Sequence, residues 1–367
     1  MLATTLAQRL RYLREDRAFS QDDVATRMGI NDRQTISAIE NGRRAVTAPE
    51  LVQLSRIFEV ELDVLTDSFR LVGEGKFSWR QVKNLPEDLN AFEMRAGRWI
   101  ATYRELRRME NANAGLTMPE LRVTENISFE EATSLGESVA VHLELGQIPS
   151  QKLREALEAK LDTLVLFIDS IQGVSGAACR LPDLNAILIN RAERSYRRHF
   201  DLGHELFHLL TWATFPPEHL ELESPKGKYR RVEQLADNFA GGLLIPSRIL
   251  ERFTKERSYV EIHEWLNTVA TELGVSSLSL KFRLLNGGVL SKKDCEAIQP
   301  EKLKNNGRTA ETIQQPLLFS HRFVKSIHWA ITKGHLSVRR AASILELSID
   351  ELADLFCDYS FDVPFDI

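Results

Sequence analysis

The chain has 367 residues, of which 43% are hydrophobic and 27% charged, a composition typical of a globular protein with more than one core. Its net charge of −5 excludes a polycation, so any binding to nucleic acid must come from a local patch. No apolar run approaches the roughly 18 residues of a membrane span, and the first residues lack the apolar segment of a secretory signal. Three cysteines without paired spacing exclude a disulfide framework and a cysteine zinc cluster. Together these features predict a cytoplasmic protein that spans no membrane.

Composition and periodicity divide the chain into five regions. Short capped helices are expected over residues 1–68, and a helical connecting region over 69–150. The strand signals and the densest chemistry fall in residues 151–290. Residues 291–316 are polar, contain two prolines and predict a linker. Residues 317–367 return to helical spacing and predict a C-terminal helical subdomain, either a hairpin packed on the preceding region or a second DNA-binding or partner-recognition module, of which the hairpin is favoured.

Residues 1–68 predict five short helices. Ser20 begins the second with a capping-box pattern, and Gly29 ends it a few residues before the third, which is helix-turn-helix spacing. In such a unit the third helix lies in the major groove of DNA. Because Ile36 and Ile39 must face the core, we expect the polar side chains around them to contact an operator: Gln21, Arg33, Gln34, Ser37, Asn41, Arg43 and Arg44.

The charge of this region is modest. Residues 1–47 carry eight arginines and six acidic residues, a balance of +2. One copy should therefore bind double-stranded DNA weakly, and a homodimer on two half-sites would bind it more tightly. The alternative is a bundle used for protein contacts. On the segments SQDDVATRMGI, RQTISAIENGRR and APELVQLSRIFEVELDVL, the region resembles the lambda-repressor-like (Xre-type) DNA-binding family.

The strongest motif is His204-Glu205-Leu206-Phe207-His208, an H-E-x-x-H on an apolar helix. Histidines four residues apart share one helix face and can bind the same zinc ion. Glu205 then lies where it can act as a general base. A peptidase zinc site needs a third protein ligand, for which Glu233 is the best candidate. Asp237, one turn later, is expected to hold a ligand histidine by its second ring nitrogen.

Two further side chains are candidates near this motif. His219 and Tyr229 are expected in the loop between the two zinc-binding helices, where either could donate a hydrogen bond to an oxyanion. The other histidines lack a partner at ligand spacing. Residues 164–168, 175–179 and 185–190 predict strands that precede the first zinc-binding helix.

The segments LVLFIDSIQGVSGAACRLPDLNAILINR, RRHFDLGHELFHLL and VEQLADNFAGGLLIP resemble the ImmA/IrrE family of metallopeptidases. The resemblance implies that His204, His208 and Glu233 bind Zn²⁺ and that Glu205 is the catalytic base. It implies a mainly α fold with a small α+β, zincin-like peptidase domain behind an N-terminal five-helix helix-turn-helix bundle. Members of the family cleave Xre-type repressors and so switch on mobile-element or stress-response genes. Two features depart from the family pattern: Asp237 stands where Asn is usual, and Gly241-Gly242 stands where small or charged helix formers are usual, although glycine lowers helix stability.

These features predict a DNA-binding zinc endopeptidase that regulates transcription, associates with the nucleoid and cleaves a repressor, another regulatory protein or itself. The main alternative is an Xre-type regulator or antitoxin-like autorepressor whose zinc site senses or stabilises without cutting. A hydrolase for a substrate other than a peptide is a third interpretation. An intact Glu205 favours the peptidase, because a purely structural zinc site needs no base.

Overall fold

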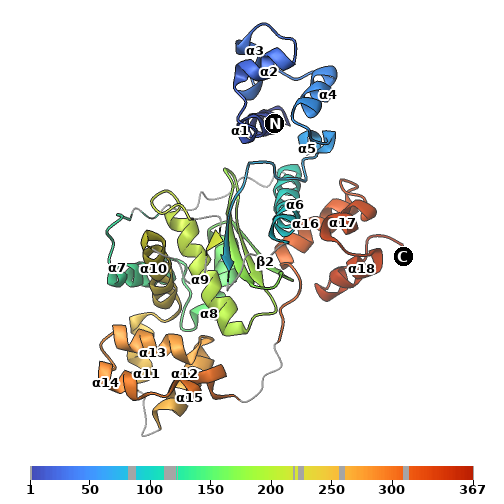
Figure 1. The fold of residues 1–367 in the computed structure, drawn as a ribbon. Helices are drawn as coiled ribbons and strands as arrows, with labels where there is room; N and C mark the ends of the chain where they lie inside the picture. The colour runs from blue at the N-terminus through green and yellow to red at the C-terminus, as the bar shows by residue number, and fades with distance from the viewer. Residues whose placement is uncertain are drawn as a thin grey trace.

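The computed structural model describes residues 2–81, 88–110, 121, 123–217, 220–221, 227–255, 261–308 and 314–366. A bundle of short helices at the N-terminus sits on a larger body in which helices flank a central sheet (Figure 1). The expected fold class, mainly α with a small sheet behind an N-terminal helix-turn-helix bundle, is confirmed. Among the described residues no helix combines the length and the apolar character needed to cross a bilayer.

The N-terminal bundle has the five expected helices, α1 (Leu2–Asp16), α2 (Gln21–Arg27), α3 (Arg33–Glu40), α4 (Ala48–Ile57) and α5 (Leu62–Thr66). Local sequence signals begin and end them. Ser20 and Asp23 form a capping box at the start of α2, and Gly29 takes the left-handed conformation, with φ of 70°, in the turn before α3. Asp32 caps α3 through the backbone N–H of Gln34 at 2.8 Å. The bundle closes over its own core, which includes Leu10, Val24, Ile36, Ile39, Leu54 and Phe58.

Five strands form one sheet in the order β2-β4-β3-β1-β5: β1 (Lys76–Gln81), β2 (Thr163–Ile168), β3 (Val174–Arg180), β4 (Asn185–Asn190) and β5 (Leu220–Glu221). β2, β3 and β4 are the three expected strands. β1 lies in the region predicted to be a helical connection, and it pairs antiparallel to β3 with Trp79 opposite Ala177. The residues around it therefore belong to the body. Its six residues are too short a stretch for their hydrophobic pattern to predict a strand paired with β3.

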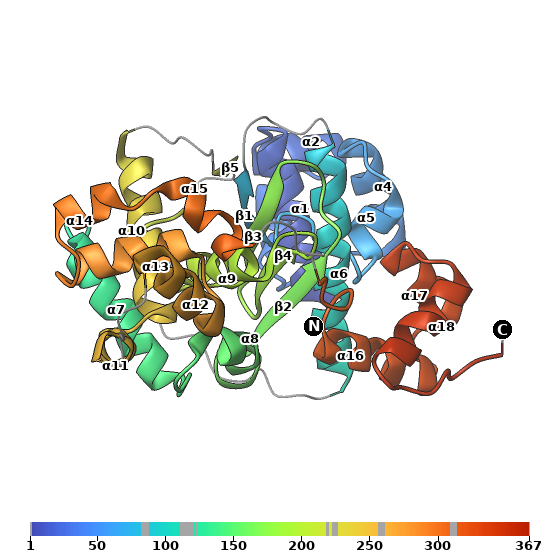
Figure 2. The ribbon, with the colours of Figure 1, turned by 90° about the horizontal axis from the view of Figure 1, so that it is seen from below.

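The two faces of the sheet have separate cores because successive strand residues point to opposite sides. On one face, Leu164, Leu166, Ala177 and Leu188 pack against α6 (Leu89–Met109) and α16 (His321–Thr332). On the other face the strands pack under the next group of helices: α7 (Phe129–His142), α8 (Pro149–Lys160), α9 (Ser195–Thr211) and α10 (Gly227–Leu244). Figure 2 shows the sheet between these two layers. The body is thus an α/β/α sandwich.

Helices α11 (Ser247–Lys255), α12 (Ile262–Leu273) and α13 (Ser277–Asn286) extend the layer that contains α10. The expected linker, residues 291–316, is structured over much of its length and corrects that prediction. It forms α14 (Lys292–Ala297), α15 (Pro300–Leu303) and a 3-10 turn (Lys304–Gly307). Ile298 and Leu303 are buried in the same core as α12 and α13. These two apolar residues anchor the otherwise polar segment. Because they stand alone, the hydrophobic periodicity of the sequence did not predict a helix there.

The C-terminal region forms three helices rather than a hairpin: α16, α17 (Val338–Leu345) and α18 (Ile349–Asp358). They pack on α6 and on the sheet face opposite α9. The Trp99 indole donates to the Ile344 carbonyl at 3.1 Å, and Phe167 forms a β-bridge with Phe319. The tail therefore completes the second core of the body, away from the H-E-x-x-H helix.

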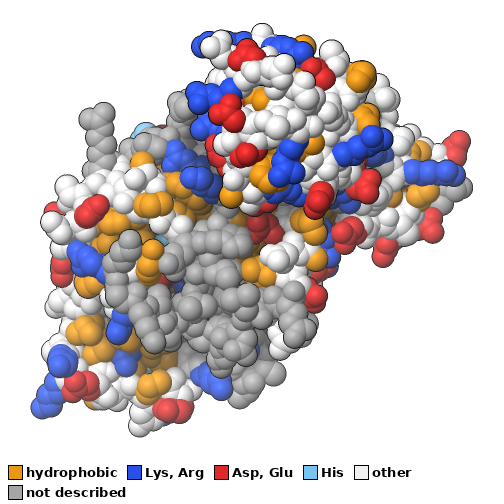
Figure 3. Space-filling model, turned by 45° about the horizontal axis from the view of Figure 1, so that its top comes forward, with side chains coloured by type: hydrophobic (Ala, Val, Ile, Leu, Met, Phe, Trp, Pro, Cys, Tyr) orange, Lys and Arg blue, Asp and Glu red, His pale blue; other side chains and the backbone are white. Residues whose placement is uncertain are grey.

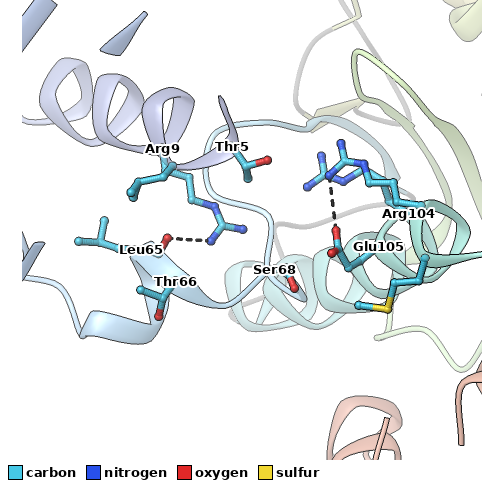
Figure 4. Close-up of a pocket in the computed structure, with 10 residues that line it drawn as sticks. Thr5, Arg9, Leu65, Thr66, Ser68, Arg104 and Glu105 are labelled. Atoms are coloured by element: carbon cyan, nitrogen blue, oxygen red, sulfur yellow. Dashed lines mark hydrogen bonds and ion pairs between the residues drawn. The ribbon is translucent and has the colours of Figure 1, made fainter. Parts of the chain in front are cut away.

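A buried ion cluster joins the N-terminal bundle to the body. Arg9 of α1 contacts Glu74 at 2.9 Å, and Arg104 of α6 contacts the same carboxylate. Arg9 also donates to the carbonyl of Asp67 at 2.9 Å, so it fixes the segment that follows α5. A pocket of about 460 Å³ opens beside the cluster between α1, α5 and α6 (Figure 4). The junction is thus built from specific contacts rather than from a free linker.

Candidate metal centre

Helix α9 carries the H-E-x-x-H motif across the sheet face that also packs against α7, α8 and α10. Its apolar residues, Leu202, Leu206, Leu209 and Leu210, are buried among the neighbouring helices and strands. His204, Glu205 and His208 have no exposed surface. The two imidazoles lie on the same side of the helix, with ring centroids 4.9 Å apart. Helical spacing has therefore brought both rings to one point under the sheet.

Helix α10 brings Glu233 to the two imidazoles. Its carboxylate oxygens lie 3.2 Å from Nε2 of His204 and 3.7 Å from Nε2 of His208, and the two Nε2 atoms are 3.0 Å apart. Phe207 of α9 packs on Phe239 of α10, with ring centroids 5.5 Å apart, which aligns the two helices. The residues predicted as ligands therefore converge, although 25 positions separate His208 from Glu233 in the sequence.

The three donor groups fit a zinc ion by chemistry and by spacing. Two imidazoles and one carboxylate form a donor set found in zinc peptidases. For ligand bonds of about 2.0–2.2 Å in a tetrahedral site, neighbouring donor atoms lie about 3.3–3.6 Å apart. The observed separations of 3.0, 3.2 and 3.7 Å bracket that value. Three protein donors also leave a fourth tetrahedral position for solvent or substrate.

Glu205 lies between the H-E-x-x-H helix and the sheet. It follows His204 directly, so it projects about 100° around the helix from that ligand. A Cβ atom placed on Gly176 of β3 would lie 3.9 Å from Cγ of Glu205. Both carboxylate oxygens are buried. The 3.9 Å separation is an ordinary packing distance, and the tighter neighbour of such a Cβ would be the Leu188 carbonyl oxygen at 3.0 Å. The glutamate therefore packs directly beneath the strand, and its carboxylate stays out of bulk solvent.

Asp237 lies one turn after Glu233 on α10 and accepts a hydrogen bond from Nδ1 of His204 at 2.9 Å. This contact leaves Nε2 of His204 directed to the metal position. Partial removal of the carboxylate from water would by itself raise the pKa of Asp237. The hydrogen bond from His204, together with the nearby charges of Arg80 and Arg197, outweighs this effect and lowers that pKa. The carboxylate is therefore ionised and can fix the tautomer and orientation of the imidazole.

Comparisons with known families agree with this geometry. Residues 10–65 match the family described as helix-turn-helix, and residues 153–285 match the IrrE N-terminal-like domain of the M78 peptidases. The chain joins a helix-turn-helix domain to an IrrE N-terminal-like domain. The suspected Xre-type and ImmA/IrrE relationships are thereby confirmed. No curated protein matches the chain.

The candidate metal centre has a neighbouring side chain, Arg80, that sequence reasoning missed. Arg80 of β1 lies 3.5 Å from Oδ1 of Asp237 and 3.4 Å from Oδ1 of Asp201, measured from its two terminal nitrogens. Asp201 is fully buried on α9 and also contacts Arg197 at 3.2 Å. No local signal pointed to Arg80, because only the pairing of β1 with β3 brings it to the site.

The two candidate oxyanion donors have different outcomes. Tyr229 lies in the first turn of α10, one turn before Glu233, and not in a loop as expected. The helix extends further toward the N-terminus than its apolar stripe indicated. Tyr229 therefore shares a helix with Glu233, a predicted ligand, and its role as an oxyanion donor stays a prediction. His219 lies outside the described residues.

The helix-turn-helix domain exposes part of the expected DNA-contact set. Arg33, Gln34, Asn41 and Arg43 are exposed at or just beyond the two ends of α3. Three of the predicted contacts have partners within the domain: Gln21 donates to Glu40 at 2.8 Å, Asn41 to the Ser37 carbonyl at 2.7 Å, and Arg44 to Glu50 at 2.7 Å. Arginine side chains lie among acidic ones over the bundle in Figure 3. This mixture agrees with the weak positive balance of the sequence.

Proposed function

We propose that the protein is a DNA-binding zinc endopeptidase that regulates transcription by cleaving a regulatory protein, such as a repressor, or its own chain. The observation that carries this proposal is the convergence of His204, His208 and Glu233 beside the buried Glu205. The match to the IrrE N-terminal-like domain supports a peptidase, and the helix-turn-helix match supports binding to double-stranded DNA.

The residues divide the chemistry between them. His204, His208 and Glu233 would hold Zn²⁺, which when bound polarises a carbonyl and lowers the pKa of a water to about 7. Glu205 takes a proton from the attacking water as the new carbon–oxygen bond forms at the scissile carbonyl. It returns the proton to the amine as the carbon–nitrogen bond breaks. Asp237 keeps the imidazole of His204 oriented throughout.

The DNA-binding domain places this chemistry near a promoter. Exposed Arg33 and Gln34 at the start of α3 can contact bases, and Arg43 beyond its end can contact phosphate. With a balance of only +2 over residues 1–47, we propose that the protein binds its operator as a homodimer on two half-sites. Cleavage of a repressor there would convert a local signal into transcription.

The deciding experiment compares the wild type with Glu205→Gln. This change keeps the shape of the side chain and removes the base, so cleavage of co-encoded proteins should fall at least about 100-fold while zinc stays bound. Glu251→Gln, on an exposed position of α11, is the matched control and should cleave normally. If Glu205→Gln holds zinc and leaves both cleavage and promoter response unchanged, the site senses or stabilises and the peptidase proposal is wrong.

A further inference from the structure

Arg80 is the one side chain of β1 that the described structure places in ion-pair contact with acids of both α9 and α10. Its guanidinium contacts Asp201 on the first helix and Asp237 on the second, at 3.4 and 3.5 Å. The same group lies 5.9 Å from the ring centre of Phe200. The side chain is 17% exposed, so its charge is partly shielded from solvent. A fork-shaped cation thus bridges the two helices that carry the predicted ligands.

Arg80 contacts the same Asp237 oxygen that accepts the hydrogen bond from His204. Oδ1 of Asp237 accepts from Nδ1 of His204 at 2.9 Å and faces the guanidinium of Arg80 as well. Asp237 itself is 48% exposed, so packing does not confine its carboxylate. An unconfined carboxylate would exchange between His204 and water. The cation of Arg80, fixed to the sheet, holds it in the conformation that contacts the imidazole.

The second contact anchors Arg80 itself. Asp201 has no exposed surface and lies one turn before His204 on α9. A buried carboxylate needs a cation nearby, because charge burial without a partner is costly. Arg197 supplies one at 3.2 Å, and Arg80 supplies the other. Asp201 therefore keeps Arg80 in place between the two helices.

We propose that Arg80 is a positioning residue of the metal centre, which holds Asp237 against His204 and thereby sets the affinity of the site for its metal ion. This inference rests on the proposed zinc site. It adds a contribution from a strand that lies outside residues 153–285, the part of the chain that matches the IrrE N-terminal-like domain. Residues that orient a metal ligand typically contribute 10- to 100-fold to metal affinity.

The test measures zinc affinity by competition with a chromophoric chelator in the full chain, so that no turnover is needed. Arg80→Ala should weaken zinc binding about 10- to 100-fold. Arg80→Lys keeps a charge that can reach one carboxylate, so its zinc affinity should lie between that of Arg80→Ala and that of the wild type. Arg197→Ala is the matched control, because it also removes a partner of Asp201, while the charge of Arg197 acts on Asp237 more weakly than that of Arg80 and forms no ion pair with it among the described contacts. Its zinc affinity should stay close to that of the wild type.

A double-mutant cycle separates positioning from general damage to the fold. Once Asp237→Ala has removed the acceptor, adding Arg80→Ala should weaken zinc binding no further. Equal effects of Arg80→Ala and Arg197→Ala, or full additivity with Asp237→Ala, would overturn the proposal. If Arg80→Ala does not fold, the cycle is run with Arg80→Lys and Arg80→Gln. A negative result in the Glu205→Gln experiment would overturn the peptidase proposal but not the proposal for Arg80, because zinc affinity is measured without cleavage.

Discussion

Helices α7 and α10 approach each other so closely that adding one methyl group at a glycine between them should push them apart. A Cβ atom on Gly242 would lie 2.1 Å from the carbonyl oxygen of Thr133, and one on Gly136 would lie 2.1 Å from that of Phe239. An ordinary carbon–oxygen contact is about 3.3 Å or more, so the obstacle at Gly242 must move by more than about 1 Å. That obstacle is backbone and cannot rotate away. The glycine that looked like a departure from helix chemistry is thus required by packing.

The magnitude follows from two opposing terms. Overpacking a core typically costs about 1–3 kcal/mol, and a backbone obstacle places Gly242→Ala at the upper end. Alanine recovers about 1 kcal/mol of helix propensity, which leaves a net destabilisation of about 2 kcal/mol. Gly241→Ala is the matched control, because its Cβ would meet nothing within 4 Å. That variant gains the propensity without the clash and should be more stable by up to about 1 kcal/mol.

Thermal unfolding followed by circular dichroism measures both variants. With about 2–4 °C per kcal/mol for a body of this size, Gly242→Ala should lower Tm by roughly 4–8 °C and Gly241→Ala should raise it by up to about 4 °C. Zinc affinity should fall in Gly242→Ala alone, since α10 carries Glu233 and a shift of this helix moves the carboxylate. Equal stability of the two alanine variants would refute the close approach of the helices.

Three further predictions concern the metal, an ion cluster and a helix cap. His204→Ala should lose nearly all bound zinc, and a chelator should lower the Tm of the wild type but not of this variant, as checked by metal analysis and melting. Glu74→Gln leaves two buried arginines without their shared carboxylate and should destabilise the protein by about 3 kcal/mol in urea unfolding; an unchanged midpoint would contradict the cluster. The hydrogen bond from Arg44, with that from the Thr47 backbone, lowers the pKa of Glu50 to about 2 from 4.5. Because the folded pKa lies below the unfolded one, the ionised Glu50 stabilises the fold fully above pH 4.5, and this stabilisation is lost as the pH falls toward 2. The Tm deficit of Glu50→Gln at pH 7 should therefore shrink below about pH 4.5.

The sequence predicted those parts of the protein that local rules determine. Capping residues and apolar spacing set α2 and α3, and the spacing of four residues within α9 is enough to pair His204 with His208. Glu233 could be predicted because its helix carries a second acid one turn later. Asp32 rather than Asn31 as the cap of α3 needed the structure, because both residue types suit that position.

Two of the missed features depend on contacts between distant segments. β1 is a strand because Trp79 lies opposite Ala177, almost a hundred positions away, and Arg80 reaches the metal centre only through that pairing. Residues 291–316 read as a linker because their few apolar side chains have no helical period, yet Ile298 and Leu303 find a core made elsewhere. Periodicity describes a single element and carries no information on which neighbour will cover it.

The position of β1 has a practical consequence for anyone who isolates the part of the chain that matches the IrrE N-terminal-like domain. This strand covers the edge of β3, and the stretch that carries it comes before residues 153–285. A fragment trimmed to those residues would present an open row of backbone donors and acceptors along Val174–Arg180, a template for pairing with other chains. We expect such a fragment to aggregate on expression, whereas one that begins before Lys76 and keeps α6 and the C-terminal helices stays dispersed.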